Sequence, residues 1–186
     1  MALERQMCPT LAEIEQKHVA RYAWASQFMV GRHVLDAACG CGYGSFLLGQ
    51  IAKTVRGIDR ADEAIAYAML HYPRENVNYL QHDMNEPEFP FAGFQGIVSL
   101  ETVEHLDAPV EDTLRRYYEV LTQGGIVCLS HPINEPPSQN PFHKQFWIDD
   151  YKLVARVVKL GFTLIESKRQ SGCALYDYHL LALRKA

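Results

Sequence analysis

The sequence of 186 residues lacks a long apolar run, a basic stretch and a cysteine pattern typical of a metal or disulfide site. No segment approaches the roughly 20 apolar residues of a membrane helix, and no apolar leader opens the chain. The formal net charge of −4 gives no support for general nucleic-acid binding. The five cysteines are an odd number, and Cys39 and Cys41 are not spaced as a CxxC pair. We therefore expect a cytoplasmic protein with reduced thiols and no membrane contact.

Hydrophobic residues make up 48% of the chain and follow the periods of helices and strands. The length suits one domain over residues 1–186, and helical spacing over 11–30 predicts an N-terminal helical cap at 1–30. Short apolar runs predict strands at 34–37, 55–59, 77–81, 96–100, 126–130, 162–166 and 175–183. Helices are predicted at 45–53, 62–71, 109–122 and 148–160. This alternation indicates an α/β fold, a parallel sheet with helices on both faces.

A glycine-rich turn follows the first predicted strand, with glycines at 40, 42 and 44. Glycine lets the backbone turn sharply and approach a ligand, and the following helix presents free N–H groups there. In such folds the ligand lies beyond the carboxyl ends of the strands. Asp36, where the strand ends, is expected to face the same crevice; the alternative is that it caps the next helix.

Acidic residues also mark the next two predicted strands: Asp59 ends the second strand, and Asp83 follows the third. A carboxylate at 59 suits the two hydroxyls of a ribose, and an acceptor at 83 suits an adenine amino group. Three acidic residues at successive strand ends favour S-adenosylmethionine (SAM), which carries a sulfonium and an ammonium group. The alternative is a nicotinamide-dinucleotide site, but its GxGxxG spacing differs from the GxGxG of this chain, and the chain is short for a separate catalytic domain.

These motifs resemble those of class I SAM-dependent methyltransferases over nearly the whole chain. Gly57-Ile58-Asp59, His82-Asp83, residues 94–106 and Gly124-Gly125 occur in the family's order, after the glycine turn. The sequence departs from the family at Ala38, where the first motif glycine is expected. The expected fold is a doubly wound, mostly parallel, seven-stranded Rossmann-like sheet with an antiparallel last strand. The resemblance implies SAM contacts from Asp36, Ala38, Gly40, Gly42, Asp59, Arg60, Asp83, Met84 and Leu100.

In this family a residue of the N-terminal helix often touches the cofactor, and the matching segment of this chain is 15–22. Arg21 is expected to pair with the carboxylate of SAM, and Tyr22 to cover the cofactor. The alternative, in which Tyr22 belongs to the core and Arg21 is solvated, stays open.

A candidate metal site follows the strand at 96–100. If residues 101–105 are helical, Glu101, Glu104 and His105 share one face, and two carboxylates with an imidazole make half of a metal shell. The alternative is a histidine that only packs and hydrogen-bonds. Without a metal, His105 or His143 is the candidate general base, beside Glu104.

The loop at 132–147 adds His143 in the segment 140–147. The two segments together resemble the metal site of small-RNA 3′-terminal 2′-O-methyltransferases, and the first also resembles ubiquinone-pathway O-methyltransferases. The Gln145-Phe146 order departs from the pattern of the RNA enzymes. The resemblance implies Glu101, Glu104, His105 and His143 as the metal ligands. Mixed carboxylate and imidazole ligands suit Mn²⁺, Co²⁺ or Fe²⁺ at least as well as Mg²⁺.

The expected reaction is O-methylation of a sugar or another small polyol, because a cation can bind a hydroxyl and lower its pKa. The alternatives are an RNA 3′-end as acceptor, metal-independent N- or C-methylation of a small molecule and, least favoured, a non-catalytic SAM-binding protein. Residues 132–147 and the N-terminal helix cover the acceptor, or a second subunit of a homodimer does; the sequence leaves both open. His33, His71 and His179 are expected to be structural or surface residues.

Overall fold

A computed structural model describes residues 7–133, 135–137, 141–146, 148–172 and 176–186. Asn140 and Trp147, two residues of the predicted substrate loop, lie outside the described residues. The strands are β1 (His33–Ala37), β2 (Thr54–Asp59), β3 (Val77–Gln81), β4 (Phe94–Leu100), β5 (Leu121–Pro132), β6 (Phe162–Gln170) and β7 (Tyr178–Lys185). The helices are α1 (Gln16–Ser26), α2 (Tyr43–Leu48), α3 (Asp62–His71), α4 (Val110–Val120) and α5 (Asp150–Lys159), with short 3-10 helices η1 (Leu11–Glu13) and η2 (Val103–His105).

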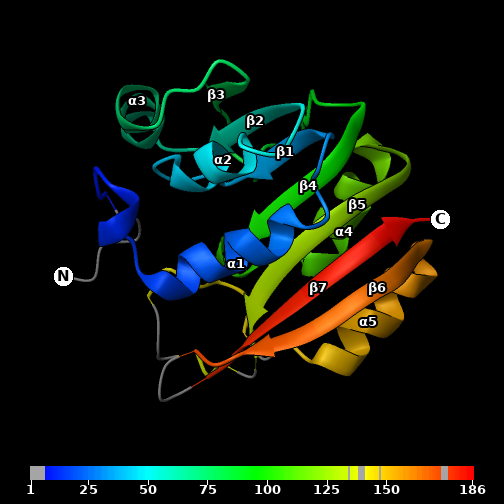
Figure 1. The fold of residues 1–186 in the computed structure, drawn as a ribbon. Helices are drawn as coiled ribbons and strands as arrows, with labels where there is room; N and C mark the ends of the chain where they lie inside the picture. The colour runs from blue at the N-terminus through cyan, green and yellow to red at the C-terminus, as the bar shows by residue number, and fades with distance from the viewer. Residues whose placement is uncertain (1–6, 134, 138–140, 147, 173–175) are drawn as a thin grey trace.

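The strands form one sheet in the order β3-β2-β1-β4-β5-β7-β6 (Figure 1). Strands β1 to β5 pair in parallel, whereas β7 runs antiparallel to both of its neighbours, β5 and β6. This confirms the predicted α/β fold and its antiparallel last strand. The strand order reverses between β1 and β4, so the crevice at their carboxyl ends is where a ligand is expected.

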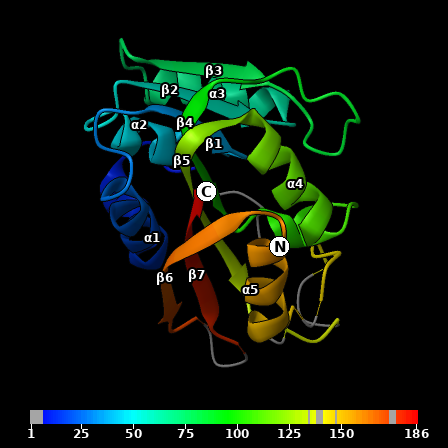
Figure 2. The ribbon, with the colours of Figure 1, turned by 90° about the vertical axis from the view of Figure 1, so that its right-hand side faces the viewer.

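The helices lie on both faces of the sheet, with α1 and α2 on one face and α4 and α5 on the other (Figure 2). Strand β1 shows why, because its successive side chains point to opposite faces. Val34 packs in one core cluster with Ala25 of α1, and Leu35 packs in another with Leu114 of α4. Because helices cover both faces of the sheet, the sequences of its central strands are short apolar runs.

The N-terminal helix is shorter than the spacing predicted. The 3-10 turn at Leu11–Glu13 is followed by extended backbone at Ile14, and α1 covers only Gln16–Ser26. Gly31, with φ of 68°, lies in the turn between α1 and β1. Apolar periodicity alone does not reveal the break, because Ile14 is buried even though it lies outside the helix.

The start of β5 also differs from the prediction. The predicted helix at 109–122 and strand at 126–130 leave Gly124 and Gly125 between them, but β5 already begins at Leu121 and contains both glycines. The pairing of β4 with β5 shifts register between Phe94 and Gly96, opposite this part of β5.

Among the described residues, no helix is long and apolar enough to cross a membrane.

Candidate active site

A cavity of about 440 Å³ opens at the carboxyl ends of the central strands. This volume lies within the range of about 300 to 1,000 Å³ that is usual for small-molecule sites. Its wall contains most of the residues singled out from the sequence: Arg21, Tyr22, Ala38, Gly40, Asp59, Arg60, Asp83, Met84, Leu100, Glu101, His105 and His143. Asp36, Gly42 and Glu104 are not part of this wall.

The glycine turn passes through the left-handed region at Ala38, Gly40 and Gly42, with φ of 59°, 54° and 89°. Gly42 caps the start of α2, and a side chain there would overlap Ala68 of α3. Gly42 therefore serves the packing of the turn against α3, and its contact with SAM stays a prediction. Ala38 adopts the same left-handed conformation without the freedom of glycine, which is a local cost that the fold sustains.

Asp59 organises the cofactor end of the cavity. Its carboxylate accepts the N–H groups of Gly40 and Ala61, each at 2.9 Å. A carboxylate can accept about four hydrogen bonds, so these two fix its orientation without exhausting its capacity. Asp83 is fixed in the same way, because it accepts the N–H of Asn85 at 2.8 Å. Both carboxylates reach the cavity already oriented.

Asp36 corrects the sequence analysis. It is fully buried and does not face the crevice, because the hydroxyls of Tyr22 and Ser45 donate to it at 3.1 and 2.6 Å. Nor does it cap α2, since its partners are side chains. Burial raises the pKa of Asp36 to about 7, although both hydroxyls oppose the rise. The ring of Tyr22 lies against Gly44 and lines the cavity, so it is both a core residue and a wall residue.

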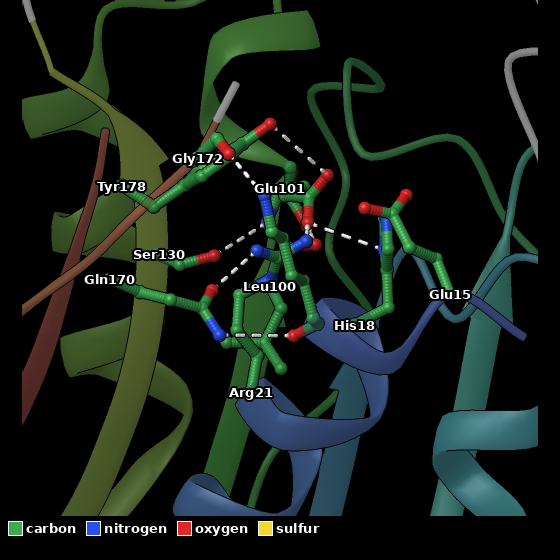
Figure 3. Close-up of polar contacts among 11 residues, drawn as sticks. Glu15, His18, Arg21, Leu100, Glu101, Ser130, Gln170, Gly172 and Tyr178 are labelled. Carbon is green, nitrogen blue, oxygen red and sulfur yellow. Dashed lines mark hydrogen bonds and ion pairs between the residues drawn. The ribbon is translucent and has the colours of Figure 1, made fainter. Parts of the chain in front are cut away.

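Arg21 is buried rather than solvated, with 2% of its surface exposed. Its guanidinium forms an ion pair with Glu101, donates to Gln170 at 2.6 Å and lies 4.5 Å from the ring centre of Tyr178 (Figure 3). These contacts tie α1 to β6, β7 and the end of β4. In this structure Arg21 therefore faces the cavity as half of an internal ion pair.

Glu101 does not take the position that the sequence predicts for it. Its φ of 51° interrupts the segment, and only Val103–His105 forms a 3-10 turn, so residues 101, 104 and 105 do not share a helical face. The N–H of Glu101 donates to Ser130 at 3.0 Å, and its carboxylate turns toward Arg21 and lies 3.3 Å from His18 (Figure 3). Glu101 thus points toward α1 instead of joining the predicted metal ligands.

His18 was missed by the sequence analysis, although it lines the cavity beside Glu101. Burial and, to a smaller extent, the charge of Arg21 lower the pKa of His18 to about 4, against the opposing effect of Glu15. His18 is therefore neutral at pH 7. Besides the nearby Glu15, the partner that brings His18 to the cavity wall is Glu101, 83 positions away in the sequence, so no local motif marks it.

The predicted metal ligands that do come together are Glu104, His105 and His143. One potential ligand atom from each lies within 4.8 Å of the others, and among the described residues Glu101 does not belong to this group. The loop is tied to η2 because the N–H groups of Lys144 and Gln145 donate to the carbonyl of Glu104. His105 is held by its Nδ1, which lies 3.1 Å from the carbonyl oxygen of Phe142.

Glu104 and Glu135 place two buried carboxylates behind the part of the wall that His105 and His143 line. Within the described part of the chain, three of their four carboxylate oxygens have no hydrogen-bond partner: both oxygens of Glu104 and the Oε1 of Glu135. Desolvation raises the pKa of Glu104 to about 8; the charge of Glu135 adds to this rise, and the charge of Arg21 opposes it. Glu135 was not predicted, because a single acidic residue in a proline-rich loop carries no periodic signal. The Oε2 of Glu135 contacts the Nδ1 of His143.

Comparison with known proteins relates the chain to methyltransferases. The family model described as "Methyltransferase domain" matches residues 34–125, from β1 to the start of β5. A probable SAM-dependent methyltransferase of Mycolicibacterium smegmatis is 31% identical over 144 residues, covering 73% of this chain and 55% of the relative. The chain belongs to the class I SAM-dependent methyltransferase family. The chain spans about half the length of the curated relatives it matches.

Two further methyltransferases resemble the chain, one in a shorter part of its sequence and one in its fold. A ubiquinone biosynthesis O-methyltransferase of Pseudomonas fluorescens is 32% identical over 113 residues, covering 59% of this chain and 47% of the relative. The N-methyltransferase NodS from Bradyrhizobium japonicum, solved in complex with S-adenosyl-L-homocysteine, superimposes with a TM-score of 0.75 at 16% identity. That superposition covers 91% of this chain and 86% of NodS, and at this identity it supports the fold of the methyltransferase alone.

Proposed function

We propose that this methyltransferase transfers the methyl group of SAM to a hydroxyl of a sugar or another small polyol, with a divalent cation at Glu104, His105 and His143. The observation that carries the proposal is the carboxylate of Glu104, fully buried, without a hydrogen-bond partner among the described residues, and close to two imidazoles. A buried carboxylate of this kind requires a proton or a nearby positive charge. A cation meets this requirement.

The cofactor end fits SAM. When bound, SAM supplies an electrophilic methyl group on a sulfonium sulfur. Asp59 would accept the ribose hydroxyls, Asp83 the adenine amino group, and the turn at Gly40 lets the backbone come close. Leu100 would lie beside the methionine part, at the end of β4. These residues orient the donor, which is the main contribution a protein can make to a direct displacement.

The acceptor end fits a cation with mixed ligands. When bound, the cation supplies Lewis acidity that lowers the pKa of a hydroxyl. One carboxylate and two imidazoles suit Mn²⁺, Co²⁺ or Fe²⁺ at least as well as Mg²⁺. Burial of Glu104 keeps water from competing for its oxygens. An aliphatic hydroxyl is a poor nucleophile at neutral pH, so activation of this kind favours an oxygen acceptor.

The charge of the cavity wall supports a neutral acceptor over the 3′-end of an RNA. The described wall contains two arginines, Arg21 and Arg60, against four acidic residues, Glu15, Asp59, Asp83 and Glu101. Arg21 is already paired with Glu101. A polyanion would need an excess of positive charge, which this wall does not offer. Hydroxyl-rich neutral rings meet no such barrier.

The test is transfer of a labelled methyl group from SAM to a panel of methyl glycosides, cyclic diols and catechols. We expect turnover with at least one of them, loss of turnover with a chelator, and recovery with Mn²⁺ or Co²⁺. Glu104→Gln should remain inactive after the metal is restored. Turnover that survives chelation would contradict the metal and leave His105 or His143 as the general base. Transfer to amines alone would contradict the oxygen acceptor.

A further inference from the structure

Glu135 and His143 form a buried pair at the edge of the proposed metal centre. Glu135 has 1% of its surface exposed and His143 has 8%. The Nδ1 of His143 contacts the Oε2 of Glu135, which follows the end of β5. The two residues are eight positions apart in the same loop, so the contact also closes that loop on itself. Glu135 does not line the cavity, whereas His143 does.

The contact decides which nitrogen of His143 carries the proton. An ionised carboxylate can only accept a hydrogen bond, so we assign the donor role in this contact to Nδ1 of His143. In the neutral ring the lone pair then resides on Nε2. A metal-binding histidine commonly has a carboxylate on its other nitrogen, which orients the ring and strengthens it as a ligand.

We propose that Glu135 is a positioning residue of this centre, which holds the Nδ1 proton of His143 so that Nε2 binds the cation. The inference rests on the metal site of the proposed function. It replaces Glu101, which the ion pair with Arg21 holds elsewhere, by Glu135 as the fourth residue of the centre. In this arrangement the carboxylate of Glu135 acts through His143 and does not contact the reacting atoms.

Two substitutions separate the hydrogen bond from the charge. Glu135→Gln keeps an oxygen that can accept the Nδ1 proton but removes the negative charge, whereas Glu135→Leu removes both. Glu166→Gln is the matched control, because Glu166 accepts a hydrogen bond from Trp24 at 3.0 Å on β6, away from the centre. Thermal unfolding of the metal-free variants reports on folding. If Glu135→Leu does not fold, the near-isosteric Glu135→Gln still tests the role of the charge.

The first readout is the ¹⁵N spectrum of the imidazoles in metal-free protein saturated with S-adenosylhomocysteine, with the signals of His143 assigned by their loss in His143→Gln. We expect the Nδ1-protonated form in the wild type and in Glu135→Gln, and loss of this preference in Glu135→Leu. A wild-type His143 that is protonated on Nε2 would overturn the proposal.

The second readout is Mn²⁺ affinity, measured on the same samples. Loss of such a partner typically weakens metal binding about 10- to 100-fold, and we expect this for Glu135→Leu, a smaller loss for Glu135→Gln and none for Glu166→Gln. Mn²⁺ binding by Glu135→Leu at wild-type strength, with Glu104→Gln defective, overturns the role of Glu135 alone. Absence of Mn²⁺ binding in the wild type overturns the proposed metal site together with this inference.

Discussion

The buried carboxylates near the two ends of the cavity differ in their hydrogen bonding. At the cofactor end, Asp59 accepts two backbone N–H groups and Asp36 accepts two hydroxyls. At the acceptor end, Glu104 is as deeply buried as Asp36, but neither oxygen of its carboxylate has a hydrogen-bond partner within the described residues. The cofactor end is thus complete as folded, whereas the acceptor end contains a charge that still requires a counterion or a proton.

The contrast separates the general part of the fold from its specific chemistry. At the glycine turn, hydrogen bonds of the protein itself orient the carboxylates of Asp59 and Asp83 in advance. The buried oxygens of Glu104 and Glu135 cost stability unless something binds there. A cost of this kind at a cavity is a reason to look for a ligand.

The strongest loss of binding is expected at the cofactor end. Asp59→Ala removes the acceptor for the ribose hydroxyls and also releases the N–H groups of Gly40 and Ala61. With about 1.5 to 3 kcal/mol for each hydrogen bond to a charged group, we expect S-adenosylhomocysteine to bind at least about 100-fold more weakly. Isothermal titration calorimetry measures this, with Glu166→Gln as control. Nearly unchanged affinity would show that the cofactor lies elsewhere.

Asp36 allows a test of burial without a ligand. Its pKa is about 7 in the folded chain and 3.8 in the unfolded reference, so between these values the folded chain holds a proton that the unfolded chain has lost. Stability therefore falls as pH rises from about 4 to 7, and this loss is absent in Asp36→Asn. We expect the wild type to lose about 2 kcal/mol relative to Asp36→Asn between pH 5 and pH 8.

Urea unfolding at the two pH values measures this difference, and other titrating groups cancel between the two proteins. Parallel stability curves for wild type and Asp36→Asn would show that the two hydroxyls keep Asp36 ionised throughout, which would contradict a pKa raised by burial.

A small effect on metal binding is expected for Glu101→Gln. Its carboxylate faces Arg21 and His18, not the cluster of ligands, so Mn²⁺ affinity should change less than about 3-fold, well below the roughly 1.4 kcal/mol of a tenfold change. The same substitution leaves the buried guanidinium of Arg21 without its ion pair and should lower the melting temperature. Loss of Mn²⁺ binding comparable to that of Glu104→Gln would restore Glu101 as a ligand.

The sequence predicted what depends on neighbours in the chain. Strand β3 at Val77–Gln81 was predicted with both of its bounds, and the glycine turn and the carboxylates after β2 and β3 were found from their spacing. Local pattern suffices there because strand, turn and acidic residue follow one another directly. The antiparallel β7 was likewise predicted in place, although it begins at Tyr178.

What the sequence did not predict depends on distant partners. Asp36 is turned from the crevice by Tyr22, which approaches from α1 over Gly44. Glu101 is held away from the other predicted metal ligands by Arg21, 80 positions earlier in the chain. Glu135 acquires a role only when the loop after β5 brings His143 beside it. These contacts arise from packing, which periodicity and motif spacing do not report.

A cation held at the acceptor end is best tested by titrating Mn²⁺ calorimetrically into protein saturated with S-adenosylhomocysteine, beside Glu104→Gln. A metal centre at Glu104, His105 and His143 requires one tight site per chain in the wild type and its loss in the variant, with binding of S-adenosylhomocysteine unchanged. No binding in the wild type, or equal binding in both proteins, would contradict it.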